Sequence, residues 1–226
     1  PAPGLLAAGG TLDVQTLVRA YSAAIFPWFS LGQPILWWSP DPRMVLQTRD
    51  FRPHRSLRKT ISRFASDPDC EIRMDTAFSK TIHACATAHR PGQSGTWIVP
   101  AMESAYQHLH RAGYAHSVET WVQDELVGGL YFVAVGKAVF GESMFSLAPD
   151  ASKLALAALV AICRDQDISM VDCQQNTRHL ASLGAREMDR SHLLAHVRSA
   201  TGDASPQWRF ERTLWRLILN PEPVIA

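Results

Sequence analysis

Apolar residues recur along this chain with two different spacings, and together they predict a mixture of helices and strands. Recurrence at every third or fourth position predicts helices over residues 13–24, 53–64, 75–86, 100–111, 151–164, 177–183 and 189–199. Apolar runs between turn residues predict strands over 43–47, 116–122, 126–135, 138–146 and 168–174, with a strand-like segment over 208–219. Short polar turns make 116–146 an antiparallel meander. The expected fold class is α+β, on the plan of acetyltransferase-like (GNAT-like) folds, in which a helix crosses between two splayed strands.

Polar residues interrupt the apolar pattern of two of these strands. Glu142 and Ser146 lie on one, and Asp172 and Gln174 lie on the other. Because side chains alternate along a strand, Asp172 and Gln174 are expected to face one cleft and Cys173 to face the core. The alternatives are a salt bridge or cap for Glu142, a helix cap for Ser146, and a buried polar network for Asp172 and Gln174.

Tryptophans gather in a segment that prolines stiffen. Trp28, Trp37 and Trp38 lie in this segment, which is predicted to be a rigid turn, and Trp97 follows later. Such a surface suits the stacking of a nucleobase. The alternative is that these tryptophans are ordinary core residues.

Charge is balanced overall and uneven locally. The formal net charge is +1, yet residues 43–64 contain seven basic residues against the single acid Asp50. This run includes Arg55, Arg58, Lys59 and Arg63 and suits a phosphate backbone, although a solvated helix face is the alternative.

Several classes of site are disfavoured. The four cysteines are widely separated, which indicates reduced thiols of a cytoplasmic protein, and neither they nor the nine histidines show a metal-binding spacing. No glycine-rich phosphate loop is present, which disfavours chemistry with ATP or NAD. No apolar run is long enough to span a membrane, and the first ten residues lack the basic region of a signal peptide.

Eight motifs, in order, resemble the leucyl/phenylalanyl-tRNA–protein transferase family. They are Ala-Tyr followed by Ile-Phe-Pro-Trp-Phe (20–29), Trp-Trp-Ser-Pro-Asp-Pro-Arg (37–43), Gly-Thr-Trp-Ile (95–98), His-Ser-Val-Glu (116–119), Gly-Glu-Ser-Met-Phe-Ser (141–146), Ala-Ser-Lys (151–153), Asp-Cys-Gln (172–174) and Ser-Leu-Gly-Ala (182–185). The resemblance implies transfer of Leu, Phe or Met from aminoacyl-tRNA to the N-terminal Arg or Lys of a protein, which creates an N-degron for proteolysis. It also implies a small N-terminal domain over 1–48, an acetyltransferase-like catalytic domain over 49–226, and no metal or organic cofactor. The implied partners are Leu-tRNA, Phe-tRNA and acceptor proteins or peptides; a monomer without membrane contact is expected.

The resemblance also assigns residues. Trp28 and Trp97 would flank the terminal adenosine, Arg55, Arg58, Lys59 and Arg63 would meet the tRNA, and Glu142, Asp172 and Gln174 would surround the attacking amine. Ser146 joins the substrate-binding residues, and the aminoacyl pocket would be lined by Leu130, Val139, Leu156, Leu159 and Val171. The chain departs from the family pattern at Ala24, where glycine is usual, at Phe132, where glycine often stands and which is expected to narrow the pocket, and at Val139, often aromatic, which is expected to compensate.

Two other functions are compatible with parts of the pattern. An acetyl-CoA-dependent N-acetyltransferase needs a glycine-rich turn for a pyrophosphate, whereas residues 147–150 include a proline and an acid. A non-catalytic tRNA-binding module would use the basic run and the tryptophans, and would not need Glu142, Asp172 and Gln174 to converge.

Overall fold

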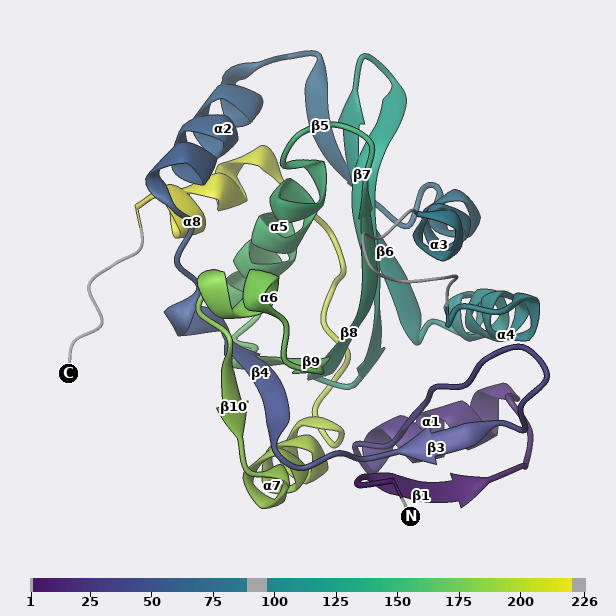
Figure 1. Ribbon diagram of the computed structural model, residues 1–226. Helices are drawn as coiled ribbons and strands as arrows, with labels where there is room; N and C mark the ends of the chain where they lie inside the picture. The colour runs from purple at the N-terminus through teal and green to yellow at the C-terminus, as the bar shows by residue number, and fades with distance from the viewer. Residues whose placement is uncertain (1, 89–96, 221–226) are drawn as a thin grey trace.

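The chain folds around a small sheet and a large sheet, and the computed structural model describes residues 2–88 and 97–220. The small sheet has the order β1-β3-β2, with β1 at Leu5–Ala8, β2 at Phe26–Pro27 and β3 at Leu36–Trp38. Helix α1 (Val14–Ser22) lies beside it, and the side chain of Asp13 caps this helix by accepting from the N–H of Thr16. Figure 1 shows this N-terminal unit below helix α4 (Pro100–Arg111). The aromatic segment expected to be a rigid turn therefore contains two short strands.

The large sheet carries the polar motifs. Its order is β10-β4-β9-β8-β7-β6-β5. The strands are β4 (Arg43–Gln47), β5 (Cys70–Met74), β6 (Ala115–Val122), β7 (Glu125–Val135), β8 (Ala138–Ser146), β9 (Met170–Gln174) and β10 (Arg186–Met188). The predicted antiparallel meander of β6, β7 and β8 is confirmed. The α+β class is confirmed as well, with a small N-terminal unit and a large mixed sheet.

Strands β8 and β9 part soon after they meet. They are parallel and pair through only two residue pairs, Val139 with Val171 and Phe140 with Asp172. Helix α5 (Ala151–Asp165) makes the crossover between them. Glu142 and Gln174 each follow the last paired residue by two positions, so both lie where the ladder opens.

Helices cover both faces of the large sheet (Figure 1). Helix α5 packs on β6 and β7, and almost all of its residues are buried. Helix α2 (Arg55–Ser66) and the C-terminal helices η2 (Arg212–Trp215) and α8 (Arg216–Leu219) cover that side, while α3 (Phe78–Thr87) and α4 cover the other. The remaining elements are η1 (Thr48–Asp50), α6 (Arg178–Ser182) and α7 (Arg190–Ala200). In the part of the chain that the structure describes, no helix is both long enough and apolar enough to span a bilayer.

Two local expectations were wrong, and two strands were not predicted. Residues 208–219 are not strand-like, because Leu214, Trp215 and Ile218 are buried at helical spacing and form η2 and α8. The edge strands β5 and β10 were not foreseen, since only short segments pair there. Helix α3 begins at Phe78 and not at Asp75, whose backbone is left-handed with a φ of 59° and whose carboxylate binds His116 and the N–H of Ser117.

Candidate active site

A β-bulge at the end of β9 directs Gln174. In the pairing of β4 with β9, Met44 faces Gln174 and Val45 faces Asp172, so Cys173 has no partner. Gln174 has a left-handed backbone with a φ of 61°, and its N–H donates to Asp172 Oδ1 over 2.8 Å. The regular alternation expected for 172–174 is therefore broken. Both Gln174 and Cys173 line the cavity described below, and Cys173, which is half-buried, also packs against the core as expected.

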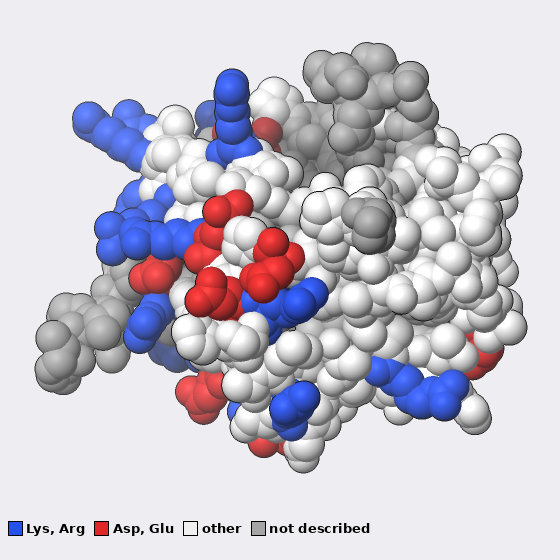
Figure 2. Space-filling model, turned by 60° about the horizontal axis from the view of Figure 1, so that its bottom comes forward, with Lys and Arg blue, Asp and Glu red and all other residues white. Residues whose placement is uncertain are grey.

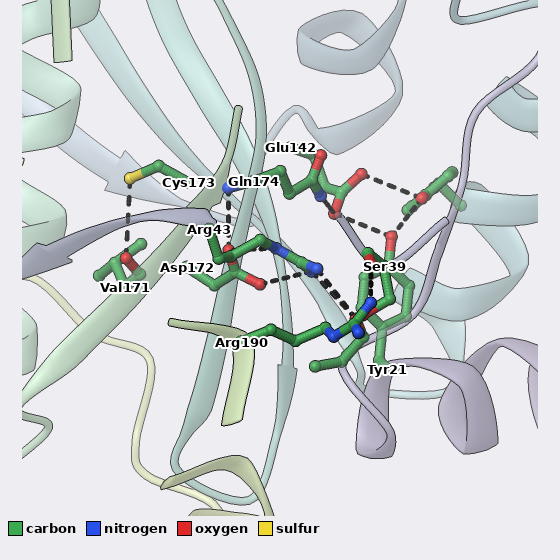
Figure 3. Close-up of polar contacts among 11 residues, drawn as sticks. Tyr21, Ser39, Arg43, Glu142, Val171, Asp172, Cys173, Gln174 and Arg190 are labelled. Atoms are coloured by element: carbon green, nitrogen blue, oxygen red, sulfur yellow. Dashed lines mark hydrogen bonds and ion pairs between the residues drawn. The ribbon is translucent and has the colours of Figure 1, made fainter. Parts of the chain in front are cut away.

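Asp172 is held from behind by Arg43. The guanidinium donates from Nε to Oδ1 over 3.0 Å and from Nη2 to Oδ2 over 2.8 Å, and both side chains are at most 2% exposed. Nη1 and Nη2 also donate to the carbonyl of Ala24, each over 3.1 Å (Figure 3). Asp172 does not line the cavity, so its contact with Gln174 runs through the backbone N–H.

Glu142 lies at the centre of a second network. Its Oε1 accepts from the hydroxyl of Tyr21 and from Nε2 of Gln174, each over 2.8 Å, and its Oε2 accepts from the hydroxyl of Tyr106 over 3.0 Å. The two tyrosine hydroxyls also bond to each other, and both tyrosines are fully buried. Figure 3 shows Gln174 and Tyr21 converging on this carboxylate.

Burial raises the pKa of Glu142 to about 7, although the hydrogen bonds from Tyr21, Tyr106 and Gln174 lower it. The pKa values of Tyr21 and Tyr106 lie well above the ordinary value, mainly because both are buried and secondly because they face this carboxylate. Glu142 can therefore exchange a proton near neutral pH while the tyrosines stay protonated.

Glu142 and Gln174 open onto a cavity of about 360 Å³. One wall is apolar and is formed by Leu130, Met144, Leu156, Leu159, Val171 and Leu180. Three aromatic side chains, Phe26, Trp28 and Trp97, also line the cavity. Trp28 is 37% exposed and is supported by Trp38, whose Nε1 donates to the Trp28 carbonyl over 2.7 Å and whose ring centroid is 5.8 Å away. A cavity lined by apolar and aromatic side chains, with a titratable carboxylate among them, suits a substrate with an apolar group and a planar ring.

Three residues of the expected pocket lie elsewhere. Ser146 does not line the cavity; its hydroxyl donates to the carbonyl of Ala148 and accepts from the N–H of Ser152, and so caps α5. Val139 is buried and is not part of the lining. Phe132 packs against His116 and, at 4.8 Å between ring centroids, against Trp208. It does not reach the cavity, so the expected narrowing of the pocket by Phe132 was wrong.

The predicted basic helix exists as α2, and its charges differ in their surroundings. Leu57, Ile61 and Phe64 form the buried face. The exposed side chains are those of Arg55, Lys59 and Arg63, whereas Arg58 is half-buried and donates to the carbonyl of Leu219. Figure 2 shows basic side chains gathered on one half of the face it presents.

Sequence reasoning missed the partners that hold the site. Tyr21 and Tyr106 come from two helices far from Glu142 in sequence, and Arg43 was counted only as part of a basic run. Tyr21 fitted the apolar stripe of a helix, so its hydroxyl gave no separate signal. Within residues 2–88 and 97–220, no group of three or more His, Cys, Asp or Glu side chains is arranged to hold a metal ion.

Comparison with known proteins agrees with these motifs. The family model described as leucyl/phenylalanyl-tRNA protein transferase matches residues 45–198, and the model of its N-terminal domain matches residues 10–41. Three similar relatives, each named leucyl/phenylalanyl-tRNA–protein transferase, come from Polaromonas sp., Albidiferax ferrireducens and Methylibium petroleiphilum. Their identities are 63%, 61% and 54%, each over 98% of this chain and over 87%, 87% and 85% of the relative. A solved structure of a conserved Staphylococcus epidermidis protein of unknown function is far less similar, with 10% identity and a TM-score of 0.39 over 82% of this chain and 68% of that chain.

Proposed function

The chain belongs to the leucyl/phenylalanyl-tRNA protein transferase family, and from this premise we propose that the cavity beside Glu142 and Gln174 is where its reaction occurs. That reaction transfers Leu or Phe from aminoacyl-tRNA to the N-terminal Arg or Lys of a protein. The observation that carries the proposal is the 2.8 Å hydrogen bond between Gln174 and Glu142, which both line the same cavity as the apolar and aromatic side chains.

The two kinds of lining side chain suit the two ends of an aminoacyl-adenosine. Leu130, Leu156 and Leu159 offer only apolar surface to the side chain of Leu or Phe. Trp28 and Trp97 suit the terminal adenine, and stacking of a base on an aromatic side chain contributes about 1–3 kcal/mol. The ester bond then lies between these two sets of side chains, next to Glu142.

The chemistry needs one proton acceptor and accurate positioning. The ester is already activated, so the main task is to hold the amine against its carbonyl carbon. The acceptor amine enters as an ammonium, and the Glu142 carboxylate takes one proton from it, which the pKa of about 7 permits. The neutral nitrogen attacks, the C–N bond forms and the bond to the ribose 3′-oxygen breaks. The second proton passes through the ribose 2′-hydroxyl to that departing oxygen.

Gln174 and Asp172 have positioning roles in this scheme. An uncharged amide is a very poor base, so Gln174 positions the amine and does not deprotonate it. Its side-chain Nε2 donates to Glu142 and holds that carboxylate in place. Asp172 acts through the backbone N–H of Gln174 and keeps it in the left-handed conformation.

The finer description of the fold is also a proposal. An acetyltransferase-like catalytic domain over 49–226 after a small domain over 1–48 is supported by the α5 crossover between two strands that pair only briefly. We further propose that the protein acts as a cytoplasmic monomer without a cofactor, because the tRNA ester supplies the activated group, and that its product is an N-degron.

The test is transfer of radiolabelled Leu and Phe, each charged on tRNA, to a peptide that begins with Arg. A peptide beginning with Ala is the control, and neither ATP nor acetyl-CoA is added. Label on the Arg peptide alone supports the proposal. Binding of tRNA without any transfer favours the non-catalytic module, and acetylation of the peptide after addition of acetyl-CoA favours the acetyltransferase.

A further inference from the structure

The segments that line the cavity differ in charge. A cavity of about 360 Å³ holds at most the aminoacyl group and part of the terminal nucleoside, so the rest of a tRNA extends beyond it. The N-terminal unit contributes Phe26, Pro27 and Trp28 to the lining. Residues 2–42 contain a single basic residue, Arg19, so this unit offers little to a phosphate chain.

Helix α6 and the residue before it contribute another part of the lining. Thr177, His179 and Leu180 line the cavity there, and Arg178 between them is exposed. Burial and the nearby Lys153 lower the pKa of His179, so cationic charge near α6 comes from arginine and lysine near pH 7.

The backbone near Arg52 is held against the two residues that follow α6, Leu183 and Gly184. The backbone N–H of Arg52 donates to the carbonyl of Leu183 over 3.0 Å. Gly184 lies so close to Asp50 that a Cβ atom there would be 2.1 Å from the Asp50 carbonyl oxygen, so no larger residue fits. Arg52 is exposed and comes three residues before Arg55, where α2 begins. The backbone of Arg52 therefore lies between the end of α6, whose first residue is Arg178, and the start of α2, which carries Arg55 and Lys59.

These four cations are available to an anion. Within the described residues, none of them takes part in an ion pair. In Figure 2 most Lys and Arg side chains lie on the left half, on which Figure 1 places α2, α6 and β10, and most of the Asp and Glu side chains in this view lie among them. Charged side chains are sparse on the right half, where the N-terminal unit lies.

We propose that Arg178 and Arg52 bind phosphodiester groups of the single-stranded 3′ end of the donor tRNA and lead it from the cavity to α2. This inference rests on the proposed function, and it assigns the tRNA 3′ end a path that does not cross the N-terminal unit. The guanidinium groups suit phosphate because each can donate two N–H groups at once.

The test compares two donors that differ only in phosphate. One is phenylalanyl-tRNA, and the other is 3′-O-phenylalanyl-adenosine, which has no phosphodiester. The variants are Arg178→Ala, Arg178→Glu and Arg52→Ala, and the matched control is Arg19→Ala on α1 of the N-terminal unit. We expect Arg178→Ala to lower kcat/KM about fivefold with tRNA and to reduce the salt slope of tRNA binding by about 0.7, the contribution of one phosphate contact on a single strand. We expect a larger loss for Arg178→Glu, and no change for any variant with the adenosine donor.

Each other outcome overturns the inference. If the Arg178 variants have the same kcat/KM with tRNA as Arg19→Ala, the path lies elsewhere. If they also lose activity with the adenosine donor, Arg178 acts on the cavity and not on phosphate. If the wild type transfers from both donors and the Arg178 variants are as active as the wild type with tRNA, the path is ruled out and the proposed function stands. A wild type that transfers from neither donor removes both.

Discussion

Replacing Tyr106 by Phe tests whether the ionised form of Glu142 is the active form. The substitution removes only the hydroxyl that donates to Glu142 Oε2 over 3.0 Å. That hydrogen bond stabilises the carboxylate and lowers the pKa of Glu142, which is about 7 because burial opposes ionisation. Without it the pKa rises, and a smaller fraction of Glu142 is ionised at any pH near neutrality.

The size of the effect follows from the bond that is lost. A hydrogen bond to a charged group is worth about 1.5–3 kcal/mol, and 1.36 kcal/mol corresponds to one pKa unit. Glu142 is half-buried and keeps its bonds from Tyr21 and Gln174, so water and these donors offset part of the loss. We expect the acidic limb of the activity profile to move to higher pH by about one unit. Activity then falls about tenfold below the limb and changes little above pH 9.

The assay is kcat/KM for transfer from Phe-tRNA to one Arg-initiated peptide between pH 5.5 and 9.5. The peptide amine titrates in this range as well, but identically for both proteins, so the difference between the two profiles reports the enzyme. Tyr114→Phe is the matched control, because Tyr114 lies outside the cavity lining. A limb that stays in place in a folded Tyr106→Phe protein, or that moves to lower pH, would refute the role given to the Glu142 carboxylate.

Three other predictions concern the backbone at Ala24, the pair of Asp172 with Arg43, and the basic helix α2. Ala24→Gly should raise the free energy of unfolding by about 1 kcal/mol in chemical denaturation, because buried Ala24 has a left-handed φ of 54° that glycine adopts without strain; a loss of stability would contradict this. Asp172→Ala should lower kcat far more than tRNA affinity and should cost about 3–5 kcal/mol of stability, since it leaves Arg43 buried without its partner; equal losses in kcat and affinity would count against positioning of Gln174. Arg55→Ala should weaken tRNA binding and lower its salt slope by about 0.9 if it contacts duplex, whereas Arg58→Ala should mainly cost about 1 kcal/mol of stability, because Arg58 binds the Leu219 carbonyl. If binding and denaturation experiments showed that Arg58→Ala weakens tRNA binding and that Arg55→Ala mainly lowers stability, the two roles would have to be exchanged.

The convergence of Glu142 and Gln174 could be predicted from sequence. Both lie in motifs on strands whose order follows from the meander and the crossover helix. The position of Asp172 could not be predicted, because it depends on the bulge between β9 and β4, which are more than 120 residues apart in the chain. For the same reason, regular alternation along the strand did not predict that Cys173 lines the cavity.

The tyrosines and the C-terminal segment show two other limits. The hydroxyls of Tyr21 and Tyr106 reach Glu142 only because α1 and α4 pack near β8. An apolar periodicity does not distinguish a tyrosine in a core from a tyrosine at a functional site. In residues 208–219, short apolar runs fit a strand and a helix equally well, and burial against α5 and α2 decided for helix.

The position of Arg43 has a consequence for motion. Its guanidinium joins the carbonyl of Ala24, in the N-terminal unit, to Asp172 in the large sheet, and Tyr21 makes a second connection to Glu142. A swing of the N-terminal unit about the segment near residue 42 would break the bonds from Arg43 to Ala24 and from Tyr21 to Glu142, whereas the Arg43–Asp172 pair, which joins β4 to β9, would stay intact. The buried carbonyl of Ala24 would lose both of its guanidinium donors, so these contacts oppose opening of the cleft by a hinge.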